Sequence, residues 1–487
     1  MRHILLLIIT LAACVTGTRA ANPKREFRGA WIQTVFQDSY LKRTTAENKA
    51  YLREQLDKLA AAGVNAVIFQ VRPQSDAFYR SEYEPWSRWL SPEGKAPRPA
   101  WDPLQFMIDE AHARGMELHA WLNPYRATTG RNQTLPAGHM YHKHPEWFVR
   151  FDGKLYYDPG RPECRSYIVN IVSDIVSRYD VDGIHFDDYF YPYPVKGVKF
   201  ADATTFKKYG KGKSLADWRR SNVDNLIRDV HQAIAGIKPW VVFGVSPFGI
   251  WRNKTTDPAG SDTRGLQNYD DLYADVLLWA RNGWIDYQLP QIYWNTDHAS
   301  ASYLTLIDWW KDHAEGRHLF VGQDVARTMG AERATERDGG QLYTKVDLTR
   351  RAESIQGNCW WPAAEITSNK GGIADILARD LQSNIALTPS YPWISEGKPL
   401  PVSNLHFRGG RLMWTSPRAK GTADDAVKFV VYRFDSADKV DLSDAGAIIG
   451  VTRDTKFDIT AGGYYVVTSL SRVNTESDDY SAIKIRL

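Results

Sequence analysis

Short β-rich runs alternate with helical patterns from residue 26 to about residue 387, and this alternation constrains the fold more than any other feature. Strands that alternate with helices indicate a parallel sheet with helical crossover connections. Eight such units can be counted, and eight fit a closed (β/α)8 TIM barrel better than an open doubly wound sheet. The sequence therefore predicts an α/β barrel over residues 26–387. The expected strands are residues 27–35, 66–72, 117–123, 183–187, 241–247, 287–293, 319–324 and 358–361.

A Pro-rich stretch at residues 388–400 cannot continue a helix, so we expect a linker there. Residues 401–487 are too few for anything larger than a small all-β sandwich. Its alternating apolar and polar runs are residues 428–433, 446–452 and 463–470. The spacing of aromatic residues in this part resembles that of a fibronectin type III module, on Trp414, Tyr432, Tyr464 and Tyr465.

Residues 1–21 have the pattern of an export signal: a basic start, an apolar run and then small residues. The apolar run is too short to span a bilayer as a helix. Within it, Leu11-Ala12-Ala13-Cys14 resembles the bacterial lipobox, in which the cysteine is lipidated and becomes the first mature residue. We therefore expect a lipoprotein of the periplasm or outer membrane, anchored through Cys14. Cleavage after Ala20, giving a soluble secreted or periplasmic protein, is the alternative.

The charge pattern excludes some partners. The chain carries 61 basic and 57 acidic residues, a net charge of +4, without a long run of one sign, so we expect no nucleic-acid partner and no polybasic membrane surface.

Two cysteines remain besides Cys14. They are Cys164 and Cys359, which lie far apart in the sequence and lack the spacing of zinc ligands. Two free, partly buried thiols are expected, and one disulfide is the alternative. No cofactor or metal is expected, and the protein is predicted to be a monomer that meets the membrane only through its lipid anchor.

Polar side chains gather at the predicted C-terminal strand ends, where a TIM-barrel enzyme holds its active site. In the fourth strand a period of two puts Gly183, His185 and Asp187 on the inward face. The inward residues of the other strands include Trp31, Gln33, Gln70, Arg72, Trp121, Asn123, Gln291 and Tyr293. Arg72 can equally be read as half of an internal ion pair, and His119 fits a hydrogen-bonded core histidine better than a catalyst.

Aromatic residues follow several of the same strands and suit the stacking of sugar rings. Among them are Tyr125, Tyr189, Trp251 and Trp294. They predict a groove that several sugars can occupy.

Four acidic residues are candidates for catalysis. Glycosidic bond hydrolysis usually needs two carboxyl groups, one protonated and one ionised. Asp187 is predicted to be the principal carboxylate, with Asp188 next and Glu365 and Asp324 as candidate partners. Because adjacent strand residues point to opposite faces, Asp187 and Asp188 can share a pocket only if the strand ends between them. In that case repulsion between the two charges would raise the pKa of one of them.

Several motifs in order carry a family resemblance. They are WLNPYR at 121–126, DPGRPE at 158–163, DGIHFDDYFYP at 182–192, GVSPFGIWR at 244–252 and PQIYW at 290–294. Over about residues 26–387 the chain resembles the glycoside-hydrolase-like family that is related to glycoside hydrolase family 10. Its members include bacterial lipoproteins, and some carry a trailing fibronectin-like module.

The resemblance implies a TIM-barrel glycosidase, and for one type of member a substrate of peptidoglycan glycan strands stripped of their stem peptides. It implies Asp187 and Asp188 as the functional acids of the fourth strand. It also implies a set of substrate-binding residues, namely Asn123, Tyr125, Arg126, Gln291, Tyr293 and Trp294. It does not transfer a settled division of roles between acid and nucleophile.

Two other classes remain open from the sequence. A metal-dependent barrel hydrolase is possible because His119, His185 and Asp187 all face the barrel interior, although the first strand lacks the His-x-His of such enzymes. A non-catalytic glycan-binding envelope lipoprotein is the third class, since no single distant acid stands out as the second catalytic group.

Overall fold

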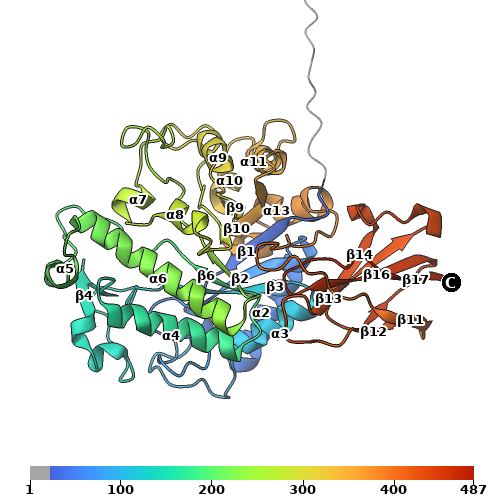
Figure 1. The fold of residues 1–487 in the computed structure, drawn as a ribbon, viewed down its shortest axis with the longest axis horizontal. Coiled ribbons are helices and arrows are strands. Elements are labelled where there is room, and N and C mark those ends of the chain that lie inside the picture. The colour runs from blue at the N-terminus through green and yellow to red at the C-terminus, as the bar shows by residue number, and fades with distance from the viewer. Residues whose placement is uncertain (1–21, 487) are drawn as a thin grey trace, which may run out of the picture.

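The computed structural model describes residues 22–486, which form a closed barrel with an all-β module on one side (Figure 1). The predicted export signal and Cys14 lie outside the described residues. Within residues 22–486, no helix has both the length and the apolar character needed to cross a membrane.

Eight parallel strands close the barrel in chain order, which confirms the predicted TIM-barrel class. They are β1 (Phe27–Ile32), β2 (Ala66–Arg72), β3 (Glu117–Leu122), β6 (Gly183–Phe186), β7 (Val242–Val245), β8 (Tyr287–Gln288), β9 (His318–Asp324) and β10 (Ile355–Trp361). The predicted sixth strand is the one that differs most, because β8 has only two residues. Pro290, which has no N–H to donate to a neighbouring strand, follows it closely.

Helices cover the outside of the barrel, and the long helices α4 and α6 run side by side (Figure 1). Those between or after the strands are α1 (Ser39–Lys42), α2 (Thr45–Ala61), α3 (Pro103–Ala113), α4 (Pro162–Arg178), α5 (Ala203–Tyr209), α6 (Leu215–Ile237), α7 (Asn268–Asp271), α8 (Val276–Arg281), α9 (Tyr303–Lys311), α10 (Val325–Gly330), α11 (Gln341–Arg351), α12 (Ala363–Thr367) and α13 (Ile373–Ile376). A hairpin of β4 (Phe148–Phe151) and β5 (Lys154–Tyr157) lies in the connection after β3.

Local sequence signals set the ends of these helices. Thr44 and Glu47 form a capping box at the start of α2, and each side chain accepts from the backbone N–H of the other residue. Gly63 follows the end of α2 with φ of 83°, a left-handed conformation that glycine adopts without strain. Asp102 caps α3, whose first residue is Pro103.

Apolar side chains fill two layers. Outward-facing strand residues such as Ile184 and Phe186 join the core between strands and helices. Inward-facing residues fill the barrel itself, where the Phe27 and Phe320 rings stack with centroids 4.1 Å apart. The interior is therefore a packed core that leaves room for a site only at one end.

The all-β module consists of seven strands in two antiparallel sheets, β11-β12-β15 and β14-β13-β16-β17. The strands are β11 (Ser403–Arg408), β12 (Arg411–Thr415), β13 (Ala426–Phe434), β14 (Ile448–Thr452), β15 (Lys456–Asp458), β16 (Gly463–Ser471) and β17 (Ser481–Ile485). The Tyr465 hydroxyl donates to the Ala461 carbonyl oxygen, a tyrosine corner typical of immunoglobulin-like sandwiches. A small all-β domain is confirmed, and its sheets are consistent with a fibronectin-like module.

The Pro-rich segment 388–400 runs across the N-terminal ends of the barrel strands. Tyr391 is buried, and its N–H donates to the Val473 carbonyl. The Trp393 indole donates to Asp286 at 2.8 Å. The segment thus packs against both the barrel and the all-β module.

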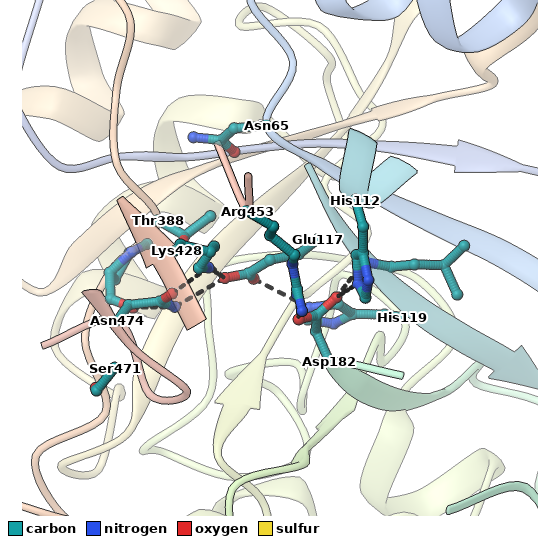
Figure 2. A network of polar contacts seen from close by, with 12 residues as sticks. Asn65, His112, Glu117, His119, Asp182, Thr388, Lys428, Arg453, Ser471 and Asn474 are labelled. Carbon is teal, nitrogen blue, oxygen red and sulfur yellow. Dashed lines mark hydrogen bonds and ion pairs between the residues drawn. The ribbon is translucent and has the colours of Figure 1, made fainter. Parts of the chain in front are cut away.

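A buried polar network ties the all-β module to that end of the barrel (Figure 2). Glu117, the first residue of β3, accepts from Lys428 Nζ at 3.0 Å and from Asn474 Nδ2 at 2.8 Å. Close by, Asp182 accepts from Arg453 at 2.6 Å and contacts His112 Nε2 at 2.8 Å. The module is therefore docked through specific charged contacts at the end of the barrel opposite the C-terminal strand ends.

Candidate functional site

A cavity of about 310 Å³ opens at the C-terminal ends of the barrel strands. Predicted site residues that line it are Trp31, Gln33, Gln70, Trp121, Arg126, Asp187, Tyr189, Gln291 and Tyr293. These side chains come from the ends of β1, β2, β3, β6 and β8 or from the segments just beyond. The fold thus brings together residues that are far apart in the sequence, because parallel strands end at the same edge.

Asp187 is the acidic residue among the described residues that line this cavity. Strand β6 ends at Phe186, so Asp187 is the first residue beyond the strand. Its Oδ1 accepts from the Asp188 N–H at 2.9 Å and from Gln291 Nε2 at 3.1 Å. Burial raises the pKa of Asp187, although those hydrogen bonds and the charge of Arg126 oppose the shift. A carboxyl group with a raised pKa, held at a cavity wall, suits proton transfer.

Asp188 lies behind Asp187 and is almost fully buried. Its Oδ2 accepts a hydrogen bond from the Tyr193 hydroxyl. Burial and the adjacent Asp187 charge raise the pKa of Asp188 well above its ordinary value. The two acids thus share one strand end, as their sequence position allowed, but only Asp187 lines the cavity.

The other two candidate acids have local partners. Asp324 caps helix α10 by accepting from the Arg327 N–H at 2.8 Å. Glu365 lies on α12 and forms an ion pair with Lys370 at 3.0 Å. Neither lines the cavity that Asp187 reaches.

His185 forms part of a buried hydrogen-bonded column below the cavity. Its Nε2 lies 2.9 Å from Ser246 Oγ and accepts from the Trp31 indole at 3.3 Å. Its Nδ1 lies 3.0 Å from the Tyr287 hydroxyl, which is 2.9 Å from His119 Nδ1. Burial and the neighbouring His119 hold the pKa of His185 well below its ordinary value, so the ring is neutral. His119 is thus a hydrogen-bonded core histidine.

Arg72 and Asn123 lie beneath the cavity. Arg72 forms a fully buried ion pair with Glu84 at 2.7 Å and also donates to the Pro124 carbonyl at 3.0 Å. Asn123 donates to the Pro73 carbonyl at 3.1 Å. Arg126 donates to the same carbonyl, and its guanidinium lies 4.7 Å from the centre of the Tyr189 ring. The buried ion pair thus supports the segment that places Arg126 at the cavity.

Three predicted aromatic residues pack beside the cavity and do not line it. Trp251 stacks on Trp309 with ring centroids 5.5 Å apart. Trp294 packs edge-on against Phe248, also at 5.5 Å. Tyr125 is fully buried.

The sequence reasoning missed four lining residues: Val35, Phe36, Ser246 and Trp361. Ser246 directly follows β7 and Trp361 ends β10. The alternation of inward and outward side chains along a strand, applied to the other strands, could have identified both residues. Phe36 lies in the connection after β1, where no periodicity applies, and it is 64% exposed with φ of 60°.

Residues 22–486 contain no group of three or more His, Cys, Asp or Glu placed to hold a metal ion. Cys164 and Cys359 are both buried and are not joined by a disulfide.

Comparison with known proteins adds independent information. Residues 26–336 match the family described as Glycosyl hydrolase-like 10. Glycosyl hydrolase YngK of Bacillus subtilis (strain 168) is 40% identical over 405 residues, which are 81% of this chain and 79% of the relative. Glycosyl hydrolase DigH of Escherichia coli (strain K12) is 43% identical over 361 residues, which are 68% of this chain and 81% of the relative.

A solved structure of the PgaB (BpsB) glycoside hydrolase domain from Bordetella bronchiseptica is 12% identical, with a TM-score of 0.44. The matched region is 72% of this chain and 98% of the Bordetella domain. The family match spans most of the barrel and confirms the resemblance seen in the motifs, since these lie within residues 121–294. The chain therefore belongs to the Glycosyl hydrolase-like 10 family.

Proposed function

We propose that this protein is an exported glycoside hydrolase that cuts peptidoglycan glycan strands lacking stem peptides. The observation that carries the proposal is Asp187, a buried carboxyl group with a raised pKa that lines a cavity at the C-terminal end of the barrel. Membership of a family whose relatives are named glycosyl hydrolases supports the reaction class. The aromatic residues of the cavity suit a sugar ring.

In the proposed mechanism Asp187 donates a proton to the glycosidic oxygen as the bond from that oxygen to C1 breaks; water adds to C1, and the proton that the water releases restores Asp187. Burial favours its protonated form, and the hydrogen bond from Gln291 fixes the orientation of its carboxyl group. Asp188 provides a second carboxyl group next to Asp187. It accepts a hydrogen bond from the Tyr193 hydroxyl. Arg126 and Tyr189 line the same cavity and contribute to substrate binding.

The test uses purified residues 22–487 and denuded glycan strands, with the release of new reducing ends as the measurement. The Asp187→Asn variant should lose at least about 100-fold in rate, the usual loss when general acid catalysis is removed. Asp324→Asn and Glu365→Gln are the matched controls, because each removes a candidate acid that does not line the cavity. An Asp187→Asn variant that cuts at the wild-type rate would overturn the assignment.

A non-catalytic glycan-binding protein is the second candidate, and one observation favours it. Asp187 is the single acidic residue that lines the cavity within residues 22–486, whereas hydrolysis usually uses two. Strands that are bound by the wild-type protein and never cut would establish this candidate.

We also propose that the chain is a lipoprotein anchored through Cys14. The lipobox-like motif of residues 11–14 supports this location. Wild-type protein expressed with its own signal should incorporate labelled fatty acid and sediment with membranes, whereas Cys14→Ser should do neither. Equal behaviour of the two would favour cleavage after Ala20.

A further inference from the structure

A second cavity, of about 690 Å³, lies beside the first and has no assigned role. Its volume is within the range of small-ligand sites. We call it the distal cavity; residues that line it include Gln74, Asp76, Arg88, Trp89, Arg131 and His139. They come from the connections that follow β2 and β3, at the same end of the barrel as Asp187.

The two cavities meet at a pair of aromatic rings. Phe36 lines the first cavity and Trp89 lines the distal one, and their rings pack edge-on with centroids 5.4 Å apart. Phe36 is 64% exposed although it is large and apolar, and its φ of 60° is a strained conformation for such a residue. An exposed ring held in this way between two cavities suits a chain ligand that passes from one to the other.

Arg88 supplies the charge of the distal cavity. Its guanidinium lies 5.2 Å from the centre of the Trp89 ring. Within residues 22–486 that guanidinium has no acidic partner and donates no hydrogen bond, so its donors are available to a ligand. Arg131, by contrast, already pairs with Asp152. A guanidinium stacked on an aromatic ring keeps its donor edge in one plane, which matches a carboxylate.

Three acidic residues line the distal cavity, namely Asp38, Asp76 and Glu93, and two of them have local partners. Oδ2 of Asp76 accepts from the Gln74 side-chain amide at 2.9 Å and from the backbone N–H of Arg88 at 3.0 Å. Glu93 pairs with Lys95. Two buried atoms, Asp76 Oδ1 and His139 Nε2, have no hydrogen-bond partner within the described residues. Unpaired polar atoms beside an aromatic wall are the features of a site that binds polar sugar rings.

We propose that the distal cavity binds a sugar that carries a carboxylate, with Arg88 as its recognition residue. The inference rests on the proposed function and refines it. When a stem peptide is removed from a glycan strand, the lactyl group of the muramic acid is left with a free carboxylate; while the peptide is attached, that group is a neutral amide followed by a bulky chain. Arg88 would therefore select strands without stem peptides.

The experiment measures binding and cutting separately. Binding is measured on Asp187→Asn protein, which keeps the ligand intact, with denuded glycan strands and with oligomers of N-acetylglucosamine, which lack the carboxylate. Adding Arg88→Gln should weaken binding of denuded strands about tenfold, the effect of one charge-assisted hydrogen-bonded pair. It should change binding of the N-acetylglucosamine oligomers less than about twofold.

Arg150→Gln is the matched control, because Arg150 is an exposed cation on β4 that lines neither cavity. It should leave both affinities unchanged, and Arg88→Lys should restore part of the affinity for denuded strands. Equal losses for both ligands, or no loss for either, would overturn the role of Arg88. Failure of wild-type protein to cut denuded strands would instead overturn the proposed hydrolase activity, and the binding measurement would still test the distal cavity.

Discussion

A pair of buried acidic side chains lies at each end of the barrel, Glu117 with Asp182 and Asp187 with Asp188, and the pKa values of the two pairs shift in opposite directions. At the end that carries the all-β module, burial alone would raise both values, but Lys428 and His119 lower the pKa of Glu117 to about 2. His112 and Arg453 lower the pKa of Asp182 well below its ordinary value. At the other end, the pKa values of Asp187 and Asp188 are both raised.

The difference lies in the partners, since all four groups are buried. Cations from the all-β module neutralise the first pair, whereas the second pair has mostly neutral donors and one arginine. Burial of a charge without a compensating charge favours the protonated acid. The first pair therefore stabilises the fold, and the second pair is held in a state that is costly for stability and useful for chemistry.

The largest expected effect is at the cavity end. Asp187→Asn should lower the rate of glycan cutting by about 10²- to 10⁴-fold because it removes the proton donor. The same change should leave the free energy of unfolding unchanged or slightly increased, because it relieves the repulsion with Asp188. Rate assays and thermal melting of the same samples check both statements; strong destabilisation would mean that Asp187 is a structural acid like Glu117.

Lys428→Met, at the other end of the barrel, should lower stability strongly and leave the rate of cutting nearly unchanged. It leaves Glu117 buried without its main cation, which should cost about 3–5 kcal/mol of stability. Activity per folded molecule at low temperature should stay within about twofold of wild type, because Lys428 lies far from the cavity along the barrel axis. Denaturant titration and assays on the soluble fraction test this, and unchanged stability would contradict the importance of the network in Figure 2.

The pH dependence of stability should also separate the two ends. Because the pKa of Glu117 is lower in the folded state, its contribution is complete above about pH 4.5 and is lost as the pH falls toward 2. The contribution is on the order of a few kcal/mol. Asp187, whose pKa is raised, acts with the opposite sign and gains stability as the pH falls through its raised value.

Acid titrations followed by circular dichroism provide the measurement. Glu117→Gln should reduce the loss of stability between about pH 4.5 and pH 2, and Asp187→Asn should leave that loss unchanged. If both variants reduce it equally, the pKa values of Glu117 and Asp187 do not shift in opposite directions.

Tyr287→Phe should give the smallest effect, since it removes one hydroxyl from the column that joins His119 and His185. Loss of a buried hydrogen-bonding group should cost about 1–3 kcal/mol. The rate should fall modestly, about tenfold or less, because Ser246 and Trp31 still contact His185. A rate loss as large as that of Asp187→Asn would show that the column itself takes part in catalysis.

Local patterns predicted much of this molecule. The periodicity located all eight barrel strands. Period-two parity also placed Asp187 and His185 toward the barrel interior. These features depend on neighbours a few residues away, so a single sequence contains the information.

Other features depend on contacts between distant segments. Asp324 and Glu365 have the same chemistry as Asp187, yet one caps a helix and the other pairs with Lys370. Arg72 faces the site end of its strand but pairs with Glu84 beneath it. No local pattern distinguishes these roles, because each is decided by which partner the packing brings within reach.

The sequence by itself determined the barrel, its strand ends and the strand-end acid on the inward face. Only the tertiary structure decided which polar residues enclose a cavity, and that Glu117 meets a lysine 311 residues further along the chain. The physical reason is that secondary structure follows from short-range periodicity, whereas the state of a buried acid follows from the charges that the fold places around it.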